Sequence, residues 1–184
     1  MTLLEQTGTP IGSYAPDFEL PGIDNQVHHL SRYLEKFRAV GVVSISNDCP
    51  YVHLYLERLK NIQSEFGSQK FTLIGINATC APQHSQECLD TMRSFAQSHQ
   101  INFPYLWDST QDVSRSFGAD KTPTAFLIDA KGVVCYQGRI DDNPQHPEAV
   151  RLHDFKNAIA AHLAGKTINP TQTDALGTPL IWRH

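Results

Sequence analysis

The sequence is poor in charge and has no long hydrophobic run. Charged residues make up 18% of the 184 residues, whereas an average globular protein has roughly 25%. The net charge of −4 leaves no basic excess for binding nucleic acid or an anionic membrane surface. The longest apolar run, residues 40–45, is far shorter than the roughly 20 residues that cross a bilayer. Because the first 14 residues also lack a basic segment followed by an apolar one, we expect a soluble, cytoplasmic protein.

Several chemical motifs are missing as well. The chain has no CxxC motif, no glycine-rich phosphate loop, no Ser-His-Asp order and no dinucleotide-binding pattern. We therefore predict neither a metal nor a cofactor. Four cysteines are present, at positions 49, 80, 88 and 135. Since no exported leader is expected, a disulfide scaffold is not predicted, and each cysteine should be either a small buried residue or an individual reactive thiol.

Length and patterning indicate one domain of the α/β class. A hydrophobic share of 40% is enough for a core, and 184 residues fit a single domain of roughly 150 with tails. We divide the chain into an irregular N-terminal arm (1–11), a domain (12–164) and a polar C-terminal tail (165–184). Strands are predicted at 17–20, 39–45, 71–76, 105–107, 125–128 and 133–136, and helices at 31–37, 50–66, 85–97, 111–117 and 152–163. The alternation of strands and helices along the chain predicts parallel strands. The hairpin turn at 129–132 adds an antiparallel edge, so we expect a central mixed sheet flanked by helices.

Cys49 is the strongest candidate for chemistry. It stands between a buried strand and the long helix that begins at Pro50. Unpaired N–H groups and the positive end of the helix dipole at this place favour the thiolate. Asp48 opposes this effect, because a neighbouring carboxylate raises the pKa of a thiol. The alternative is a buried cysteine that only fills the end of the strand.

The order of elements and two short motifs resemble the thioredoxin fold. Cys49-Pro50 begins the long helix, and Thr122-Pro123 precedes a strand, like the cis-proline loop that faces the active-site cysteine in that fold. More narrowly, the chain is similar to the peroxiredoxin-like redoxins of the alkyl hydroperoxide reductase/thiol-specific antioxidant superfamily. The matching pieces are Ala15-Pro-Asp-Phe-Glu-Leu20, Asn47-Asp-Cys-Pro-Tyr-Val52, Asn102-Phe-Pro-Tyr-Leu106, Asp108-Ser-Thr-Gln-Asp112, Thr122-Pro123 and Gly138-Arg-Ile-Asp-Asp-Asn143.

The resemblance implies a thiol-dependent oxidoreductase. Cys49 would attack a peroxide or a disulfide, and an external thiol would reduce it again. Ser46 keeps a hydroxyl where peroxiredoxins have threonine, Pro123 would be cis and face Cys49, and Arg139 would have to supply the activating arginine. Val52 stands where thioredoxins have their second cysteine. Thr178 stands where relatives often have a cysteine in the tail.

The other cysteines leave alternatives open. Cys80 follows the second strand at the sheet edge that should carry Cys49. Three roles are open for it: resolving an oxidised Cys49, pairing with Cys88, or being a loop thiol without a role. Cys88 falls on the apolar stripe of its helix and Cys135 lies in a hairpin strand, so we expect both to be core residues.

A second class of function is a binding module without catalysis. His53 follows Cys49 by four residues, which places both side chains on one side of the helix, where they could bind a protein partner or a soft metal such as copper(I). The alternative is a histidine that faces solvent. Asp141 and Asp142 are expected to form a turn, with Arg139 either paired to one of them or directed to the Cys49 thiolate.

Overall fold

A five-stranded mixed sheet forms the centre of the protein. The computed structural model describes residues 8–184, so residues 1–7 of the predicted arm lie outside the described residues. The strand order is β5-β4-β3-β7-β8, in which β3, β4 and β5 are parallel and β7 and β8 are antiparallel to their neighbours. The sheet strands are β3 (Ala39–Ser44), β4 (Phe71–Asn77), β5 (Tyr105–Trp107), β7 (Ala125–Asp129) and β8 (Val134–Gly138). The predicted α/β fold with a central mixed sheet is confirmed.

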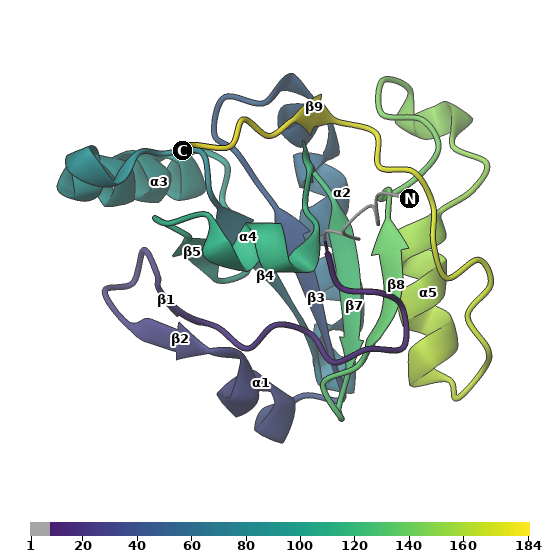
Figure 1. Cartoon of the computed structure of the whole chain (residues 1–184). Coiled ribbons are helices and arrows are strands. Elements are labelled where there is room, and N and C mark those ends of the chain that lie inside the picture. Colours follow the sequence, from purple (N-terminus) through teal and green to yellow (C-terminus); the bar gives the residue numbers. More distant parts are fainter. Residues whose placement is uncertain (1–7) are drawn as a thin grey trace, which may run out of the picture.

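Five helices surround this sheet in the part of the chain that the structure describes (Figure 1). They are α1 (Leu30–Lys36), α2 (Pro50–Phe66), α3 (Ser85–Ser98), α4 (Asp112–Phe117) and α5 (Asp154–Leu163). Short 3-10 turns cover Gly67–Gln69, Pro82–His84 and Pro147–Ala149. No helix among residues 8–184 is both long and apolar enough to cross a membrane.

Alternating side chains of each strand feed two hydrophobic clusters, one on each face of the sheet. In β3, Ala39 and Val43 join the cluster with α2, α3 and α5, whereas Val40 and Val42 join the cluster with α1 and α4. This is the period of two that a buried strand requires. Because both faces are covered, β3 and β4 are buried along their whole length.

The long helix begins and ends where the sequence predicts. Pro50 occupies the first turn of α2, where its missing N–H has no partner to lose. One stripe of α2 is buried: Val52, Tyr55, Leu56, Leu59, Ile62 and Phe66.

The start of α5 differs from the prediction. The helix was predicted to begin at Leu152, but it begins at Asp154 and the Leu152 side chain is exposed.

Four short strands differ from the prediction. The strand predicted at 17–20 is found at 19–21, and the other three were not predicted. β1 (Glu19–Pro21) pairs with β2 (Val27–His29), and β6 (Lys121–Thr122) pairs with β9 (Thr178–Pro179). Segments of two or three residues show no hydrophobic period, so their pairing depends on tertiary contacts. The β6–β9 pair brings the predicted C-terminal tail back onto the domain.

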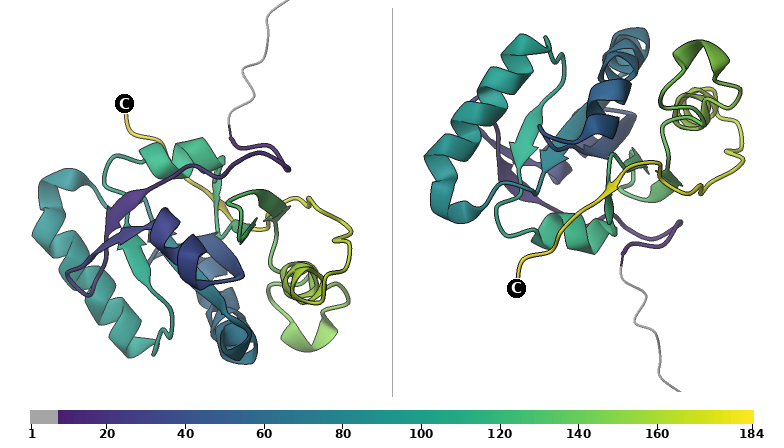
Figure 2. Two further views of the ribbon diagram at one scale, coloured as in Figure 1. Left: turned by 90° about the horizontal axis from the view of Figure 1, so that it is seen from below. Right: turned by 90° about the horizontal axis from the view of Figure 1, so that it is seen from above.

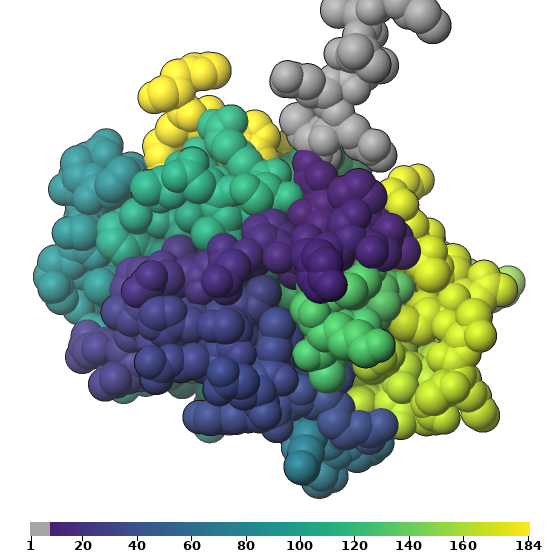
Figure 3. Space-filling view, turned by 60° about the horizontal axis from the view of Figure 1, so that its bottom comes forward, coloured from purple at the N-terminus to yellow at the C-terminus, as the bar shows by residue number. Residues whose placement is uncertain are grey.

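Both terminal segments lie along the domain. Residues 9–15 run beside the β7–β8 hairpin, where Gly12 N–H donates to the Val134 carbonyl and Ala15 N–H to the Gly132 carbonyl. Figure 3 shows this purple segment stretched over the surface beside the green hairpin. The yellow C-terminal segment crosses the opposite end of the molecule, from the α5 side toward α4 (Figure 2, right).

Candidate active site

Cys49 lies at the N-terminus of α2, at the edge of the sheet where the parallel strands end. It is the N-cap residue of the helix, and only 5% of it is exposed. The thiol donates a hydrogen bond to the Thr122 carbonyl, with an Sγ to oxygen distance of 3.1 Å. The predicted placement of Cys49 at a strand-to-helix junction is therefore what the structure shows.

The loop that contains Pro123 faces Cys49. The Thr122–Pro123 peptide bond is cis, as predicted. Ser44, the last residue of β3, holds this loop: its hydroxyl donates to the Lys121 carbonyl at 2.7 Å and accepts the Thr124 N–H at 2.8 Å. Sequence reasoning did not identify Ser44, although a buried serine at the end of a central strand needs such partners.

Several groups determine the pKa of Cys49. Burial raises the pKa, while hydrogen bonding to the side chains of Thr122 and Thr178 lowers it, and the backbone N–H groups of Val52 and Tyr51 lower it further. The net pKa lies below the ordinary thiol value. The sulfur forms no capping hydrogen bond with α2, so we attribute the effect of these N–H groups to the positive end of the helix dipole.

The C-terminal segment covers this thiol. The Thr178 hydroxyl lies 3.5 Å from Cys49 Sγ, and β9 pairs with β6 of the proline loop. Gly177 permits the approach, because a Cβ at this position would collide with the Thr122 carbonyl. Leu180 is buried, and its N–H donates to the Asp120 carbonyl at 2.7 Å.

Polar contacts fasten the end of this segment. Gln111, which is fully buried, donates from Nε2 to the Ala78 and Ile181 carbonyls and accepts the Arg183 N–H at 2.7 Å. The Arg183 guanidinium donates to the Ser109 carbonyl at 2.7 Å. We call residues 177–183 the strap. The prediction of a polar tail gave no indication of these contacts.

A second network fixes the loop before Cys49. The buried Tyr105 hydroxyl donates to Asn47 Oδ1 at 2.6 Å and accepts from Asn77 Nδ2 at 2.9 Å. Asn77 Oδ1 accepts the Thr79 N–H and hydroxyl. The Thr79 hydroxyl also lies 3.3 Å from the Ser46 hydroxyl. The loops that follow β3 and β4 are therefore joined through side chains from β4 and β5.

Two predicted site residues have other partners. Ser46 is buried and its hydroxyl contacts Thr79, with no hydrogen bond to Cys49 Sγ in the described structure. Arg139 has a different partner from those expected: its Nε donates to Asp154 Oδ2 at 2.7 Å, at the start of α5. The Asp154 carboxylate, brought close by the turn into α5, satisfies the guanidinium. Arg139 thus pairs neither with the thiolate nor with Asp141, whose carboxylate binds Arg58.

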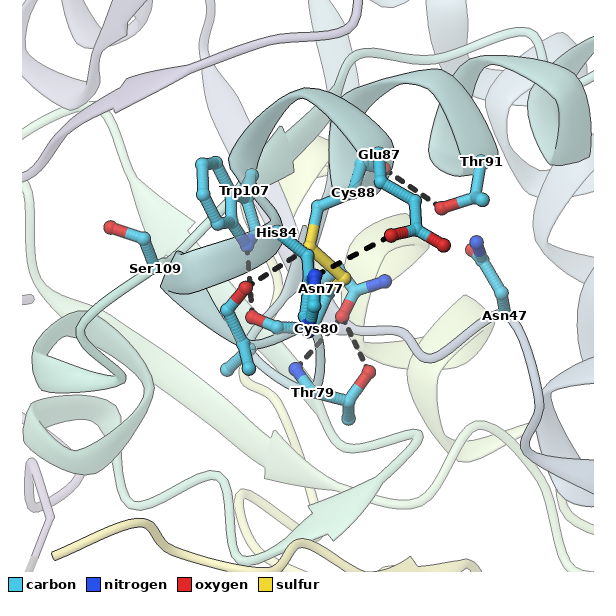
Figure 4. The surroundings of a disulfide bond; sticks show 12 residues. Asn47, Asn77, Thr79, Cys80, His84, Glu87, Cys88, Thr91, Trp107 and Ser109 are labelled. Carbon is cyan, nitrogen blue, oxygen red and sulfur yellow. Dashed lines mark hydrogen bonds and ion pairs between the residues drawn. A yellow bond between two sulfur atoms is a disulfide. The ribbon is translucent and has the colours of Figure 1, made fainter.

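Cys80 and Cys88 form a disulfide, which confirms one of the alternatives for Cys80 and corrects two expectations (Figure 4). Cys88 is buried as predicted, but it is not merely a core residue, and these two cysteines are not individual thiols. The bond joins the loop after β4 to the first turn of α3 over a separation of 8 residues. The Trp107 indole donates to the Cys80 carbonyl at 3.2 Å, which further fixes this loop.

His53 is exposed to solvent, and its ring nitrogen is hydrogen-bonded to the main chain. Its Nε2 donates to the Asn47 carbonyl at 2.6 Å, and its ring packs edge-on against Phe95 and His99. Among residues 8–184, no group of three or more histidine, cysteine or acidic side chains is placed to hold a metal. Asp48 is exposed to solvent, which weakens its effect on the neighbouring sulfur.

Comparison with known proteins identifies the family. The sequence pattern of the AhpC/TSA family matches residues 11–137 of this chain. The chain belongs to the AhpC/TSA family. The predicted redoxin family and thioredoxin-like fold are thereby confirmed. This match contains Cys49, Ser46 and Pro123 but ends before Arg139 and before the strap.

Individual relatives extend this result. A thiol-disulfide oxidoreductase ResA of Geobacillus thermodenitrificans is 26% identical over 156 residues, which is 80% of this chain and 82% of that protein. A hypothetical protein of Sinorhizobium meliloti is 30% identical with a TM-score of 0.85, covering 96% of this chain and 97% of the other. An uncharacterized conserved protein of Geobacillus kaustophilus is 26% identical with a TM-score of 0.86, over 96% and 95% of the two chains.

Proposed function

We propose that this AhpC/TSA-family protein is a thiol-disulfide oxidoreductase in which Cys49 is the nucleophile. The observation that carries the proposal is the arrangement around Cys49 Sγ: a thiol of lowered pKa at a helix N-terminus, against the cis-proline loop. The similarity to proteins named as thiol-disulfide oxidoreductases supports it.

The first step is attack by the Cys49 thiolate on a disulfide sulfur of the substrate. A mixed disulfide forms, and the other half of the substrate leaves as a thiolate. A second thiolate then attacks this mixed disulfide and releases Cys49. Val52 occupies the place of a neighbouring second cysteine, so that thiol must come from elsewhere.

The surrounding residues position the sulfur for this step. Ser44 holds the proline loop against Cys49, and the Thr178 hydroxyl stabilises the thiolate. Because only 5% of Cys49 is exposed, a substrate reaches the sulfur after the strap moves away from the proline loop. The partners we propose are therefore a disulfide substrate that enters at this edge and an external thiol reductant.

Peroxide reduction is a second proposed activity, and the Thr178 hydroxyl beside Cys49 favours it. A peroxide oxygen next to Sγ would accept a hydrogen bond from this hydroxyl, and attack by the thiolate would give a sulfenic acid and water or an alcohol. Arg139, the arginine expected to activate Cys49 for peroxide reduction, is paired with Asp154 instead. We therefore place disulfide exchange first.

We also propose that the protein acts in the cytoplasm, as expected from the sequence. Fractionation of the source cells would test this location.

A turnover assay tests the proposed function. Dithiothreitol reduces the enzyme while oxidised glutathione or hydrogen peroxide serves as the oxidant, and loss of each oxidant is measured. We expect native protein to accelerate the disulfide reaction, and Cys49→Ser to lose this acceleration. Cys135→Ser is the matched control, because it makes the same substitution at a cysteine on β8, which has no part in the proposed reaction. Full activity of Cys49→Ser would contradict the proposal, and acceleration with peroxide alone would favour the second activity.

A further inference from the structure

The Cys80–Cys88 pair lies beside the loop that carries Cys49. β3 and β4 are parallel neighbours, so the segments that follow them leave the same edge of the sheet. Thr79, immediately before Cys80, contacts the Ser46 hydroxyl at 3.3 Å. The Tyr105 hydroxyl bridges Asn47 and Asn77, as described above. Two separate contacts therefore hold the two cysteine-bearing loops together.

The two sulfurs of the pair differ in access. Cys80 is partly exposed, whereas Cys88 is fully buried. The side chains of residues 82–87, between them, are exposed, so a movement of this loop gives up little buried surface. An incoming thiolate therefore reaches Cys80, and Cys88 is the leaving sulfur. Cys88 lies in the first turn of α3, where the helix dipole favours its thiolate.

The remaining cysteine of the chain is a poor partner for Cys49. Cys135 lies on β8, and its thiol donates to the Leu127 carbonyl within the hairpin. Burial raises the pKa of Cys135 to about 12, which keeps it protonated at neutral pH. Within the chain, the thiols available to an oxidised Cys49 are consequently those of Cys80 and Cys88.

We propose that Cys80 and Cys88 form a second redox site, a dithiol–disulfide pair that regenerates Cys49 after each reaction. This inference rests on the proposed function. In the mixed disulfide of Cys49 with a substrate thiol, the Cys80 thiolate attacks the Cys49 sulfur, and the substrate leaves as a thiolate. The Cys88 thiolate then attacks the Cys80 sulfur. This step forms the Cys80–Cys88 disulfide and releases the Cys49 thiolate.

The electrons balance over this sequence. One substrate disulfide gains two electrons and becomes two thiols, and the Cys80 and Cys88 thiols lose two electrons and become one disulfide. A free Cys49 thiol beside a closed Cys80–Cys88 disulfide, as observed here, is the last state of the sequence. An external dithiol then attacks Cys80 and restores the reduced pair.

The test follows one turnover of the full-length protein. Fully reduced protein is mixed with one equivalent of oxidised glutathione, quenched with acid and alkylated, and its disulfides are mapped by peptide mass spectrometry. In native protein we expect a free Cys49, a Cys80–Cys88 disulfide and two equivalents of released glutathione. In Cys80→Ser, Cys49 should keep its glutathione. In Cys88→Ala, a Cys49–Cys80 disulfide should accumulate.

Further variants separate this inference from the proposed function. Cys49→Ser should form the Cys80–Cys88 disulfide at least about tenfold more slowly, and Cys135→Ser should behave like native protein. If Cys49→Ser forms it as fast as native protein, or if the Cys49–glutathione adduct persists in native protein, the relay is refuted while the nucleophilic role of Cys49 is not. If Cys49 takes up no glutathione even in Cys80→Ser, the proposed function fails together with the relay. Cys88 is buried, so Cys88→Ala can also lower stability. Rapid quenching of native protein tests the same step without this variant, because it should show a transient Cys49–Cys80 disulfide.

Discussion

Weakening the strap should make Cys49 more reactive, and Leu180→Ala is the most direct way to weaken it. Leu180 is 7% exposed, and its neighbour in the strap, Ile181, is 85% exposed. Truncation of a buried leucine to alanine costs about 2–5 kcal/mol. We use the low end, about 2 kcal/mol, because a terminal segment can partly collapse onto the space that is left.

This loss shifts the equilibrium between the closed and the open strap. Since each 1.4 kcal/mol changes an equilibrium constant tenfold, about 2 kcal/mol makes the open state roughly 30 times more populated. If the strap opens and closes quickly relative to the chemical step, the rate of Cys49 alkylation rises by the same factor. Leu180 belongs to neither of the two hydrophobic clusters that pack on the sheet, so the domain itself should remain folded.

The assay is the rate of iodoacetamide labelling at Cys49 in folded protein, resolved by peptide mass spectrometry. Ile181→Ala is the matched control, because it removes an exposed side chain from the adjacent position. We expect labelling roughly 30 times faster in Leu180→Ala and an unchanged rate in Ile181→Ala. Equal rates in the two variants and in native protein would refute the conclusion that the strap controls access to Cys49.

Three further predictions concern the strap, the thiols and a buried ion pair. Gly177→Ala should raise the Cys49 labelling rate as well, because the new Cβ collides with the Thr122 carbonyl and displaces the strap; an unchanged rate would contradict the close approach. Cys49 should label at lower pH than Cys135, since its pKa is lowered and that of Cys135 is raised to about 12; the reverse order in peptide-resolved labelling would contradict the site electrostatics. Asp141→Asn should lower the free energy of unfolding by about 3 kcal/mol, because it leaves the Arg58 guanidinium without its buried partner, whereas Glu65→Gln, at an exposed pair with Lys156, should cost less than about 1 kcal/mol in the same denaturation experiment.

The lowered pKa of Cys49 also links stability to pH. Because the folded pKa lies below the unfolded one, the thiolate stabilises the native state above the ordinary thiol pKa, and this contribution is lost as pH falls through the folded pKa. Native protein should therefore gain stability relative to Cys49→Ser as pH rises from neutral into the alkaline range. Denaturant unfolding of both proteins at a series of pH values measures this difference. A constant difference would contradict the lowered pKa.

The sequence predicts the elements that have a clear period. The apolar stripe of α2 and the hairpin of β7 and β8 are long enough for hydrophobic spacing to define them. The cis bond before Pro123 and its position against Cys49 came from the family resemblance, and the structure confirms both. In contrast, β6 and β9 have two residues each, and their pairing depends on a close approach that Gly177 permits.

The partners of the site residues could not be predicted in the same way. Arg139 had two nearby carboxylates in sequence, and the turn into α5 brings a third, Asp154, to 2.7 Å. Cysteine spacing does not define a disulfide, so Cys80 remained open among three roles. Gln111 lies in one of the pieces that match the family, but that match assigns no role to its side chain. It became informative only when its buried amide was found to hold the strap.

The central claim is that Cys49 is the sulfur that reacts first. The most direct measurement mixes fully reduced protein with one equivalent of an aromatic disulfide, quenches it at the earliest accessible time and determines which cysteine carries the mixed disulfide. The account predicts that the first adduct forms at Cys49 and that its rate follows the Cys49 thiolate as pH is raised. A first adduct at Cys80, Cys88 or Cys135, with Cys49 still unmodified, would contradict it.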